Sequence, residues 1–502
     1  MENLDLNVLV TTPVRERHAL LLPDNNSENS ATIDYLTNSP LFTTHALAQD
    51  VPVAPQMRPS QCGLLAALSL ERHDASDTPP FHQDDADRRL FFNVTTPSSI
   101  FICGSQGSGK SHTLSCLLEN CLADSDATIL PRPLSALLFH YDTFISDDGG
   151  SPCEAAFLAS LSGVQVRVVC APTNIRTIQR TYQHLNVNVE PLQIDSYDLN
   201  TKRILDLMAV KPEEGSIPLY VHTVTRILRE MRMSQQATGA RFDYQTFKAE
   251  ILAADLSPAQ LAPLSQRLAM LESFMPPMGD MRKEEKQQSH KGTIWTNQPG
   301  LLTIVDLSCP CVSPETACSL FNICLSLFLE QKIVCGRVIA LDEAHKYMTS
   351  SPESSVLTHS LLSTVRLQRH LGARIFVSTQ EPTIAPAFLD LCTVTIIHRF
   401  SSPAWLHALD AHIALMQQQP PESDSAAQRD GRSSGSRKET AREIFRKIIK
   451  LEPGQALVFA PSAMAAIGDV DGSDQDGSMG FYLQVRVRSR LSDDGGCSVL
   501  AG

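Results

Sequence analysis

The sequence Ser-Ser-Ile-Phe-Ile-Cys-Gly-Ser-Gln-Gly-Ser-Gly-Lys-Ser-His-Thr at residues 98–113 decides the fold. The apolar run 98–103 predicts a buried strand, the glycine-rich segment 104–111 follows at once, and residues 114–122 are typical of a helix. A strand, a glycine loop and a helix in this order form the context of a phosphate-binding P-loop. The alternative, a glycine turn beside a surface lysine, is disfavoured by both flanking elements.

The residue types of this loop match the chemistry of a bound nucleotide. Glycines let the backbone turn tightly and aim its N–H groups at phosphate oxygens, and the start of the helix adds a partial positive charge. We expect Lys110 to reach the β- and γ-phosphates of ATP and the Ser111 hydroxyl to hold Mg²⁺. The residues expected to contact the nucleotide are Gly104, Ser105, Gln106, Gly107, Ser108, Gly109, Lys110, Ser111 and His112.

A second strand supplies the carboxylates that such a site needs. Residues 338–341 are apolar, and Asp342 and Glu343 follow at the end of the run, where ligands bind in open α/β sheets. We expect Asp342 to hold Mg²⁺ and Glu343 to orient and polarise the attacking water as a catalytic residue. The alternative is a strand that ends in acids for solubility.

Two further catalytic candidates follow along the chain. The apolar run 374–378 leads to Gln380, which could sense the γ-phosphate or the water, or could simply cap a loop. Hydrolysis often needs an arginine from a neighbouring subunit. The four candidates, each with a plain surface arginine as the alternative, are Arg366, Arg369, Arg374 and Arg399. Arg399 is favoured because it directly follows the apolar run 394–398.

Apolar runs recur from about residue 90 onward and are separated by helical stretches. They lie at 98–103, 136–141, 164–170, 301–306, 338–342, 374–378, 394–398 and 456–460. This rhythm predicts an α/β fold of the RecA/ASCE-like P-loop NTPase type, with a mostly parallel sheet and helices on both faces.

The chain divides into six segments on pattern. We expect residues 1–90 to form a poorly structured N-terminal region with one short helix near 63–72. We expect residues 91–170 to form the first part of the ATPase core. Residues 171–300 are expected to form a mainly α-helical insertion, and residues 301–416 the second part of the core. Residues 417–442 are expected to be a disordered loop, and residues 443–502 to form strands that complete the core. The expected helices of the insertion are 201–210, 220–233, 244–254 and 257–274, the last with a kink or a later start at Pro263.

Bulk composition narrows the class of protein. Lysine and arginine number 42 against 55 aspartate and glutamate, a net charge of −13, which gives no general support to nucleic-acid or membrane binding. The longest apolar stretch, 317–329, is too short to span a membrane, and charges within residues 1–22 disfavour a secretory signal. We expect an intracellular protein, in the cytoplasm or nucleus, without a membrane partner.

The thirteen cysteines predict buried, reduced thiols rather than a disulfide framework. Several fall in strand-like or helix-like runs, for example Cys103 and Cys170. Four others raise the alternative of a zinc site: Cys309, Cys311, Cys318 and Cys324. Their spacing does not match paired zinc knuckles, so core thiols are favoured.

Several motifs together resemble the HerA/FtsK class of P-loop ATPases, and HerA-like proteins in particular. They are Asp-Glu-Ala-His-Lys-Tyr at 342–347, Thr-Val-Arg-Leu-Gln-Arg at 364–369, Gly-Ala-Arg-Ile-Phe-Val-Ser-Thr-Gln-Glu-Pro at 372–382 and Thr-Ile-Ile-His-Arg-Phe at 395–400. The resemblance covers residues 95 to 400 and implies site roles for Asp342, Glu343, Gln380 and Arg399. It also implies a hexameric ring that uses ATP to move DNA.

The chain departs from that pattern in two places. HerA-like proteins carry an N-terminal β-barrel, whereas residues 1–90 show no series of alternating strands, and the position after the glutamine, often arginine in the family, is Glu381. Asp-Glu-Ala-His also names a helicase group, but no second ATPase lobe follows residue 400. An alternative function therefore stays open: a nucleotide-dependent switch or scaffold that acts through protein partners with little turnover.

Contact with DNA would depend on basic stretches of the chain. Basic stretches occur at 176–180, 226–241, 429–450 and 486–490 and could contact phosphates. Aromatic residues, which would stack on single-stranded bases, are not interleaved with them. Solvated helix or loop faces are the alternative for each stretch.

Overall fold

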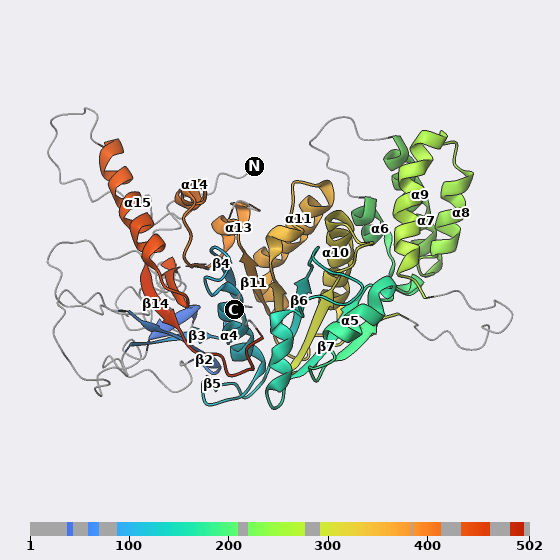
Figure 1. The fold of residues 1–502 in the computed structure, drawn as a ribbon. Helices are drawn as coiled ribbons and strands as arrows, with labels where there is room; N and C mark the ends of the chain where they lie inside the picture. Colours follow the sequence, from blue (N-terminus) through green and yellow to red (C-terminus); the bar gives the residue numbers. More distant parts are fainter. Residues whose placement is uncertain are drawn as a thin grey trace, which may run out of the picture.

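The computed structural model describes residues 38–43, 59–69, 88–208, 219–276, 292–382, 384, 386–412, 433–461 and 482–495. In these ranges the chain forms one large mixed sheet with helices packed on its two faces (Figure 1). The strand order is β1-β3-β2-β14-β13-β12-β4-β11-β10-β6-β9-β7-β8, and β5 pairs with β2. The predicted α/β class, with a mostly parallel core, is confirmed.

Eight adjacent strands pair in parallel and form the core of the sheet. They are β12 (Val394–Ile397), β4 (Ser99–Cys103), β11 (Ala373–Thr379), β10 (Arg337–Leu341), β6 (Ser135–His140), β9 (Leu301–Asp306), β7 (Gln165–Cys170) and β8 (Asn188–Pro191). Seven of the eight lie on predicted apolar runs. The eighth, β8, falls inside the expected helical insertion, and its short Asn-Val-Glu-Pro sequence is tolerated because it forms the edge of the sheet.

The remaining strands extend the sheet in antiparallel pairs beyond β12. They are β13 (Gln455–Phe459), β14 (Leu483–Val487), β2 (Cys62–Leu68), β3 (Arg89–Asn93), β1 (Leu41–Thr43) and β5 (Thr128–Ile129). The C-terminal strands β13 and β14 thus continue the sheet from β12.

The expectation of one short helix near residues 63–72 is wrong, because this segment contains strand β2. Its Leu- and Ala-rich sequence favours a helix, but pairing with β3 on one side and β14 on the other holds it extended. Helix α4 also packs closely here, since a Cβ on Gly63 would lie 2.4 Å from Cγ of Asn120. Strands β1, β2 and β3 thus give the N-terminal region a structured part.

Alternate residues of each core strand enter two separate hydrophobic clusters. In β4, Phe101 and Cys103 belong to one cluster, whereas Ile100 and Ile102 belong to the other. In β6, Leu137 and Phe139 alternate with Ala136 and Leu138 in the same way. This period of two in a strand buried on both sides is the signature of a sheet covered by helices on both faces.

The helices divide between these two clusters. On one face lie α4 (Lys110–Leu122), the short helix η4 (Glu154–Ser160) and α5 (Ile175–Thr181). On the other lie α10 (Pro314–Glu330), α11 (Pro352–Arg366), α13 (Pro386–Leu391) and α14 (Pro403–His412), with α12 (Gln368–Leu371) joining α11 to β11. Figure 1 shows α10, α11 and α13 side by side over the parallel strands.

The insertion carries a further group of helices at the β7–β8 side of the molecule, and their buried residues join the same hydrophobic cluster as those of α10 and α11 (Figure 1). They are α6 (Thr201–Met208), α7 (Leu219–Thr238), α8 (Tyr244–Ala253) and α9 (Pro258–Ser273). Ser257 and Gln260 form a capping box that starts α9, so the predicted start is confirmed and the later start at Pro263 is wrong. The expected apolar stripe packs inward at Leu264, Leu268 and Leu271.

Helix α15 (Ser433–Lys450) begins inside the segment 417–442 that was expected to be a disordered loop. The rest of that segment lies outside the described residues. Figure 1 shows α15 beside β14, at the end of the molecule opposite α7–α9. Among the described helices, none is long and apolar enough to cross a membrane.

Candidate nucleotide-binding site

The P-loop lies between β4 and α4, where close backbone approach requires glycine. A Cβ on Gly104 would lie 2.7 Å from Cβ of His398, and one on Gly109 would lie 3.1 Å from the backbone nitrogen of Gly454. Gly109 also has a φ of 107°, which an L side chain rarely adopts. The loop therefore packs against the ends of β12 and β13 and keeps its shape only with glycine at these positions.

Lys110 is almost fully buried at the first turn of α4, with 4% of its surface exposed. Its Nζ donates a hydrogen bond of 3.0 Å to the Ser105 carbonyl and thereby points back over the loop. Burial lowers the pKa of Lys110, against the opposing effect of the charges on Glu343 and Asp342. An ammonium held here by a single carbonyl is placed to exchange that contact for phosphate oxygens.

The other predicted contact residues of the loop differ in how far their side chains are exposed. Gln106 and Gly107 are exposed at its tip, Ser105 is half-buried, and Ser108 is buried, with its hydroxyl donating to the Ser105 carbonyl at 2.7 Å. Ser111 is half-buried in the first turn of α4.

The His112 side chain faces away from a loop ligand. Its Nε2 lies 2.7 Å from the Arg488 carbonyl, so the ring contacts the chain after β14.

His398 joins the loop, helix α4 and strand β13 at one buried point. Its Nδ1 lies 3.0 Å from the Gln455 carbonyl, and its Nε2 lies 2.9 Å from Oγ1 of Thr113. The carbonyl can only accept, so the network assigns the proton to Nδ1 and leaves Nε2 as acceptor. Burial lowers the pKa of His398 to about 4, so the ring is neutral at physiological pH.

Asp342 directly follows β10 and is 5% exposed. Its Oδ2 lies 3.3 Å from Nδ1 of His140, at the end of the neighbouring strand β6, and 3.8 Å from Sγ of Cys153. Its Oδ1 is buried without a hydrogen-bond partner among the described residues. A hard carboxylate oxygen left free in this way fits the predicted role toward Mg²⁺, either directly or through water.

Glu343 occupies a strained position next to Asp342. Among the described residues, Glu343 is the only non-glycine residue with a positive φ, and its value is 47°. Such conformations persist where the surrounding structure fixes them, and they concentrate at functional sites. Here the fixing contacts are a 3.0 Å hydrogen bond from Nε2 of Gln380 to Oε2 of Glu343, and Nε2 of His345 at 3.4 Å from the same oxygen.

Gln380 and Glu343, which the sequence predicts as separate catalytic candidates, therefore meet in the structure. The backbone nitrogen of Gln380 also lies 3.3 Å from Nδ1 of His345, which closes a small network across the ends of β10 and β11. Burial lowers the pKa of His345, with Glu343 acting in the opposite direction, so its ring is a neutral link in this network.

The four arginine candidates lie in different environments. Arg374 is buried and donates to the Gly372, Val94 and Thr95 carbonyls, so it supports the amino end of the sheet and cannot serve as a finger. Arg366 and Arg369 are exposed. Arg399 is exposed at the end of β12, and its carbonyl accepts from the nitrogen and the hydroxyl of Ser105.

The chain after β14 returns to the P-loop helix and is anchored there. Arg488 and Glu119 form a buried ion pair of 2.7 Å, with side-chain exposures of 8% and 0%. Ser492 adds a 2.6 Å hydrogen bond from its hydroxyl to the same carboxylate. Burial raises the pKa of Glu119, but the hydrogen bonds from Ser492 and Arg488 outweigh it and lower that pKa overall.

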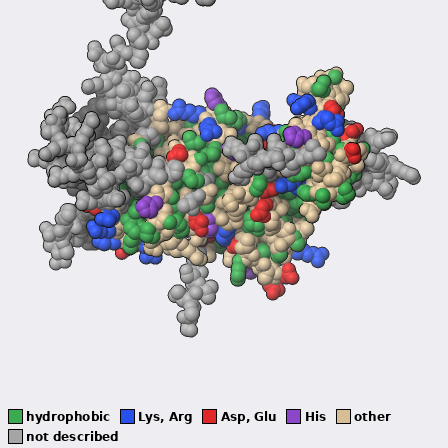
Figure 2. Space-filling model, turned by 90° about the horizontal axis from the view of Figure 1, so that it is seen from above, with side chains coloured by type: hydrophobic (Ala, Val, Ile, Leu, Met, Phe, Trp, Pro, Cys, Tyr) green, Lys and Arg blue, Asp and Glu red, His purple; other side chains and the backbone are tan. Residues whose placement is uncertain are grey.

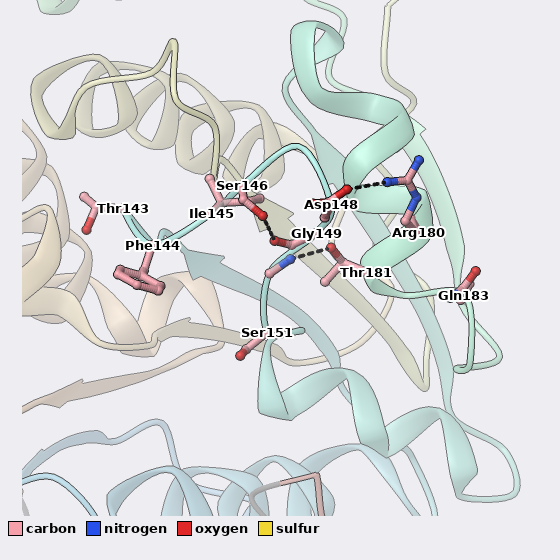
Figure 3. Close-up of a pocket in the computed structure, with 11 residues that line it drawn as sticks. Thr143, Phe144, Ile145, Ser146, Asp148, Gly149, Ser151, Arg180, Thr181 and Gln183 are labelled. Carbon is pink, nitrogen blue, oxygen red and sulfur yellow. Dashed lines mark hydrogen bonds and ion pairs between the residues drawn. The ribbon is translucent and has the colours of Figure 1, made fainter. Parts of the chain in front are cut away.

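A hollow of about 720 Å³ opens beside the loop that follows β6. Figure 3 shows its wall, residues 143–151, facing Arg180, Thr181 and Gln183 of the α5 region. The loop is fixed by a hydrogen bond of 3.1 Å from the Gly150 nitrogen to Oγ1 of Thr181. Its other end is fixed at Asp142, which pairs with Lys346 at 3.1 Å.

Four site residues were not predicted as such: His140, Cys153, His345 and His398. The sequence carried a signal for two of them, since His345 belongs to the Asp-Glu-Ala-His motif and His398 ends a predicted apolar run. His140 also ends a predicted run, but only the pairing of β6 with β10 places it beside Asp342. Cys153 comes from an irregular loop and gave no pattern.

The structure thus brings together a strand, a glycine loop, a buried lysine and, two positions away in the sheet, a strand that ends in two acids. The fold is that of a P-loop NTPase. The strand β11, which ends near Gln380, lies between the P-loop strand β4 and the acidic strand β10, so the three candidate groups share one edge of the sheet.

The chain is similar to known proteins in structure but not in sequence. No family model matches the chain, and no curated protein sequence matches it. VirB4 of Thermoanaerobacter pseudethanolicus is 11% identical over 78% of this chain and 89% of its own, with a TM-score of 0.46. The plasmid coupling protein TrwB in complex with the ATP analogue ADPNP is 12% identical over 79% and 86%, with a TM-score of 0.42.

A third structure is the genome packaging NTPase B204 from Sulfolobus turreted icosahedral virus 2, in complex with AMPPCP. It is 9% identical over 72% of this chain and 92% of its own, with a TM-score of 0.27. Two of the three structures, TrwB and B204, were determined with a bound ATP analogue. Sequence identities and TM-scores this low do not assign a function to the chain.

Proposed function

We propose that the protein is an ATPase of HerA-like type, which hydrolyses ATP with Mg²⁺ and couples this to DNA handling. The observation that carries the proposal is the hydrogen bond from Gln380 to Glu343 at the edge of the sheet that holds the P-loop. A plain nucleotide-binding turn does not need an acid in a strained conformation held by the neighbouring strand.

Each residue has a distinct task in this proposal. The loop 104–111 and the start of α4 hold the phosphates with backbone N–H groups, and Lys110 turns from the Ser105 carbonyl to the β- and γ-phosphates. Glu343 accepts a proton from the attacking water as general base, while Gln380 orients its carboxylate. Burial lowers the pKa of Lys110, and the charges on Glu343 and Asp342 oppose this effect and favour the charged form that binds phosphates.

Ser111 and Asp342 are the residues that would hold Mg²⁺. The ion, when bound, neutralises charge on the β- and γ-phosphates. The unpartnered Oδ1 of Asp342 supports this assignment, since a buried carboxylate oxygen is costly to leave without a partner. Oxygen donors are the type that Mg²⁺ prefers.

Ring assembly and DNA coupling would involve residues on the exposed side of the site. Arg399 is exposed at the end of β12, beside the P-loop, where it could complete the site of a neighbouring subunit in a ring, as an arginine finger does. Figure 2 shows Lys and Arg mixed with acidic side chains on the face seen from above, rather than gathered in one band. Any DNA contact on this face would therefore be made by a few cations.

Nucleotide binding is tested by titrating the purified protein with a fluorescent ATP analogue. Lys110→Ala should weaken binding by at least tenfold, because a charge-assisted contact contributes about 1.5–3 kcal/mol. The matched control is Lys248→Ala, a lysine of α8 that pairs with Glu272 and should leave the affinity unchanged. Equal affinity of wild type and Lys110→Ala would contradict the assignment of the loop.

The second candidate is a nucleotide-dependent switch that acts through protein partners with little turnover. The group α6–α9 favours it, because these helices stand apart from the nucleotide site and offer a large additional surface (Figure 1). Hydrolysis that DNA does not stimulate would favour this candidate over the first.

A further inference from the structure

A buried cluster of His140, Cys153 and Asp342 lies behind the proposed Mg²⁺ site. The three residues are 6%, 1% and 5% exposed. One ligand atom of each, an imidazole nitrogen, a thiol sulfur and a carboxylate oxygen, lies within 4.8 Å of the other two. They come from the end of β6, the cap of η4 and the end of β10, so three separate elements converge on one point.

We propose that this cluster is a binding site for a tetrahedral transition-metal ion, Zn²⁺ being the expected one. The distances fit such an ion: Nδ1 of His140 lies 3.3 Å from Oδ2 of Asp342, and Sγ of Cys153 lies 3.8 Å from the same oxygen. A tetrahedral Zn²⁺ with ordinary bond lengths keeps its ligand atoms about 3.3–3.7 Å apart. Two of the three separations are therefore close to those of such a site, and the third, between the ligand atoms of His140 and Cys153, is within 4.8 Å.

Charge and ligand type select this class of ion. On binding, the Cys153 thiol and Nδ1 of His140 each give a proton to solvent, so a thiolate, a carboxylate and a neutral imidazole surround a 2+ ion and the site has no net charge. Neutrality suits a buried position, where an uncompensated charge would be costly. A thiolate excludes Mg²⁺ and Ca²⁺, whereas mixed nitrogen, sulfur and oxygen ligands favour Zn²⁺.

Within the part of the chain that the structure describes, two buried polar atoms of the cluster lack hydrogen-bond partners, and the segment that carries the thiol is held in place. Nε2 of His140 and Oδ1 of Asp342 are both buried without a hydrogen-bond partner among the described residues, so the cluster has unused donor capacity. The hydroxyl of Tyr182 accepts from the Cys153 backbone nitrogen at 2.9 Å and donates to Oδ2 of Asp306 at 2.7 Å, which fixes the thiol-bearing segment. Three protein ligands leave a fourth position for water, as in other open zinc sites.

A bound ion would also link the two sites. Asp342 is shared with the proposed Mg²⁺ site, and a second 2+ charge beside it would disfavour Mg²⁺. His140 and Cys153 bracket the loop whose residues 143–151 line the hollow of Figure 3, so the ion would also clamp the base of that loop. Metal binding itself needs no ATP, so this inference and the proposed ATPase can fail separately.

Cobalt(II) provides the test, because a cobalt ion bound to a thiolate in a tetrahedral site absorbs visible and near-ultraviolet light strongly. The full chain, stripped of metal with a chelator under reducing conditions, is titrated with Co²⁺ in the absence of ATP. We expect one equivalent to give a thiolate-to-cobalt band that Zn²⁺ then abolishes. Cys153→Ser should lose the band, whereas Cys311→Ser, which changes an exposed cysteine, should keep it.

His140→Gln is the second variant, in case Cys153→Ser does not fold. It retains the cysteine but removes the imidazole ligand, so it should weaken Co²⁺ binding by at least tenfold. Circular dichroism confirms that each variant is folded. Absence of the band in folded wild type, or an unchanged band in folded Cys153→Ser or His140→Gln, would overturn the inference and leave the cluster as hydrogen-bond support for Asp342.

Discussion

At the scale of residues, the site depends on a few buried polar groups whose partners come from distant parts of the chain. Lys110 has one carbonyl partner, Glu343 is held by Gln380, and His398 connects the P-loop helix to β13. Each of these groups is buried or half-buried, so a lost partner would leave a polar atom unsatisfied. This is why substitutions here should have specific rather than general effects.

The stability of the fold should depend on pH through His398. Its pKa is about 4 in the folded protein against about 6.5 in the unfolded chain, so the unfolded state binds more protons between these values. This contribution is fully present above pH 6.5 and is lost as the pH falls toward 4, by up to about 3 kcal/mol. His398→Asn, which keeps one donor, should flatten the fall measured by denaturant unfolding across that range.

The control for this measurement is His359→Asn, which changes an exposed histidine of α11. It should leave the pH dependence as it is in wild type. An identical fall in stability for His398→Asn and wild type would contradict the neutral, buried state of His398.

At the scale of elements, the P-loop helix α4 is held by the segment that follows β14. The segment after β14 binds α4 through the ion pair of Arg488 with Glu119, on the side of the helix that faces the antiparallel strands. Arg488 also donates to the Leu64 carbonyl of β2, so one side chain connects three elements. The C-terminal strands therefore support the nucleotide site and do not merely extend the sheet.

Glu119→Gln should destabilise the protein by about 3–5 kcal/mol, because it leaves the Arg488 charge buried without its partner. The free energy of unfolding, measured by denaturant titration, gives the value. Glu452→Gln is the matched control, since it breaks an exposed pair with Arg486, and it should cost less than about 1 kcal/mol. Equal losses for the two variants would contradict the supporting role of the C-terminal segment.

The sequence predicted the parallel core well, because a strand buried on both faces carries a continuous apolar run. All eight runs are strands, from β4 to β13. It failed at β2 and β8, where the local pattern favours a helix or no regular structure and only pairing with neighbours makes a strand. The sequence of a single segment does not determine which distant strand it pairs with.

The candidate site was also predictable only where the local sequence carries a pattern. The P-loop, Asp342, Glu343 and Gln380 could be predicted because each lies at the end of a recognisable strand or in a motif. Their mutual contact could not be predicted, since it depends on the order β4-β11-β10 in the sheet. Cys153 was missed because its role comes only from convergence on Asp342.

At the scale of the whole molecule, the nucleotide site lies in the middle of a long sheet, between the antiparallel strands at one end and the group α6–α9 at the other (Figure 1). The exposed side of the P-loop includes Gln106, Gly107 and Arg399. A site that is open on one side suits completion by a second copy of the chain.

Mixing inactive variants tests this assembly. Arg399→Ala should bind ATP but hydrolyse it slowly, since an arginine finger contributes about 10³–10⁵ to turnover, and Lys110→Ala should not bind it. An equimolar mixture should recover about a quarter of the wild-type rate if subunits mix at random in a ring. Each variant alone is the control. A mixture as inactive as its components would show that Arg399 does not act across a subunit interface.

The most direct test of the central claim is steady-state ATP hydrolysis by the purified protein, with Glu343→Gln and the remote control Glu230→Gln, each with and without duplex DNA. The account predicts turnover that DNA stimulates, a loss of about 10²–10⁴-fold in Glu343→Gln with ATP binding retained, and wild-type rates in Glu230→Gln. Tight ATP binding with negligible turnover in wild type, with or without DNA, would contradict it and favour the switch.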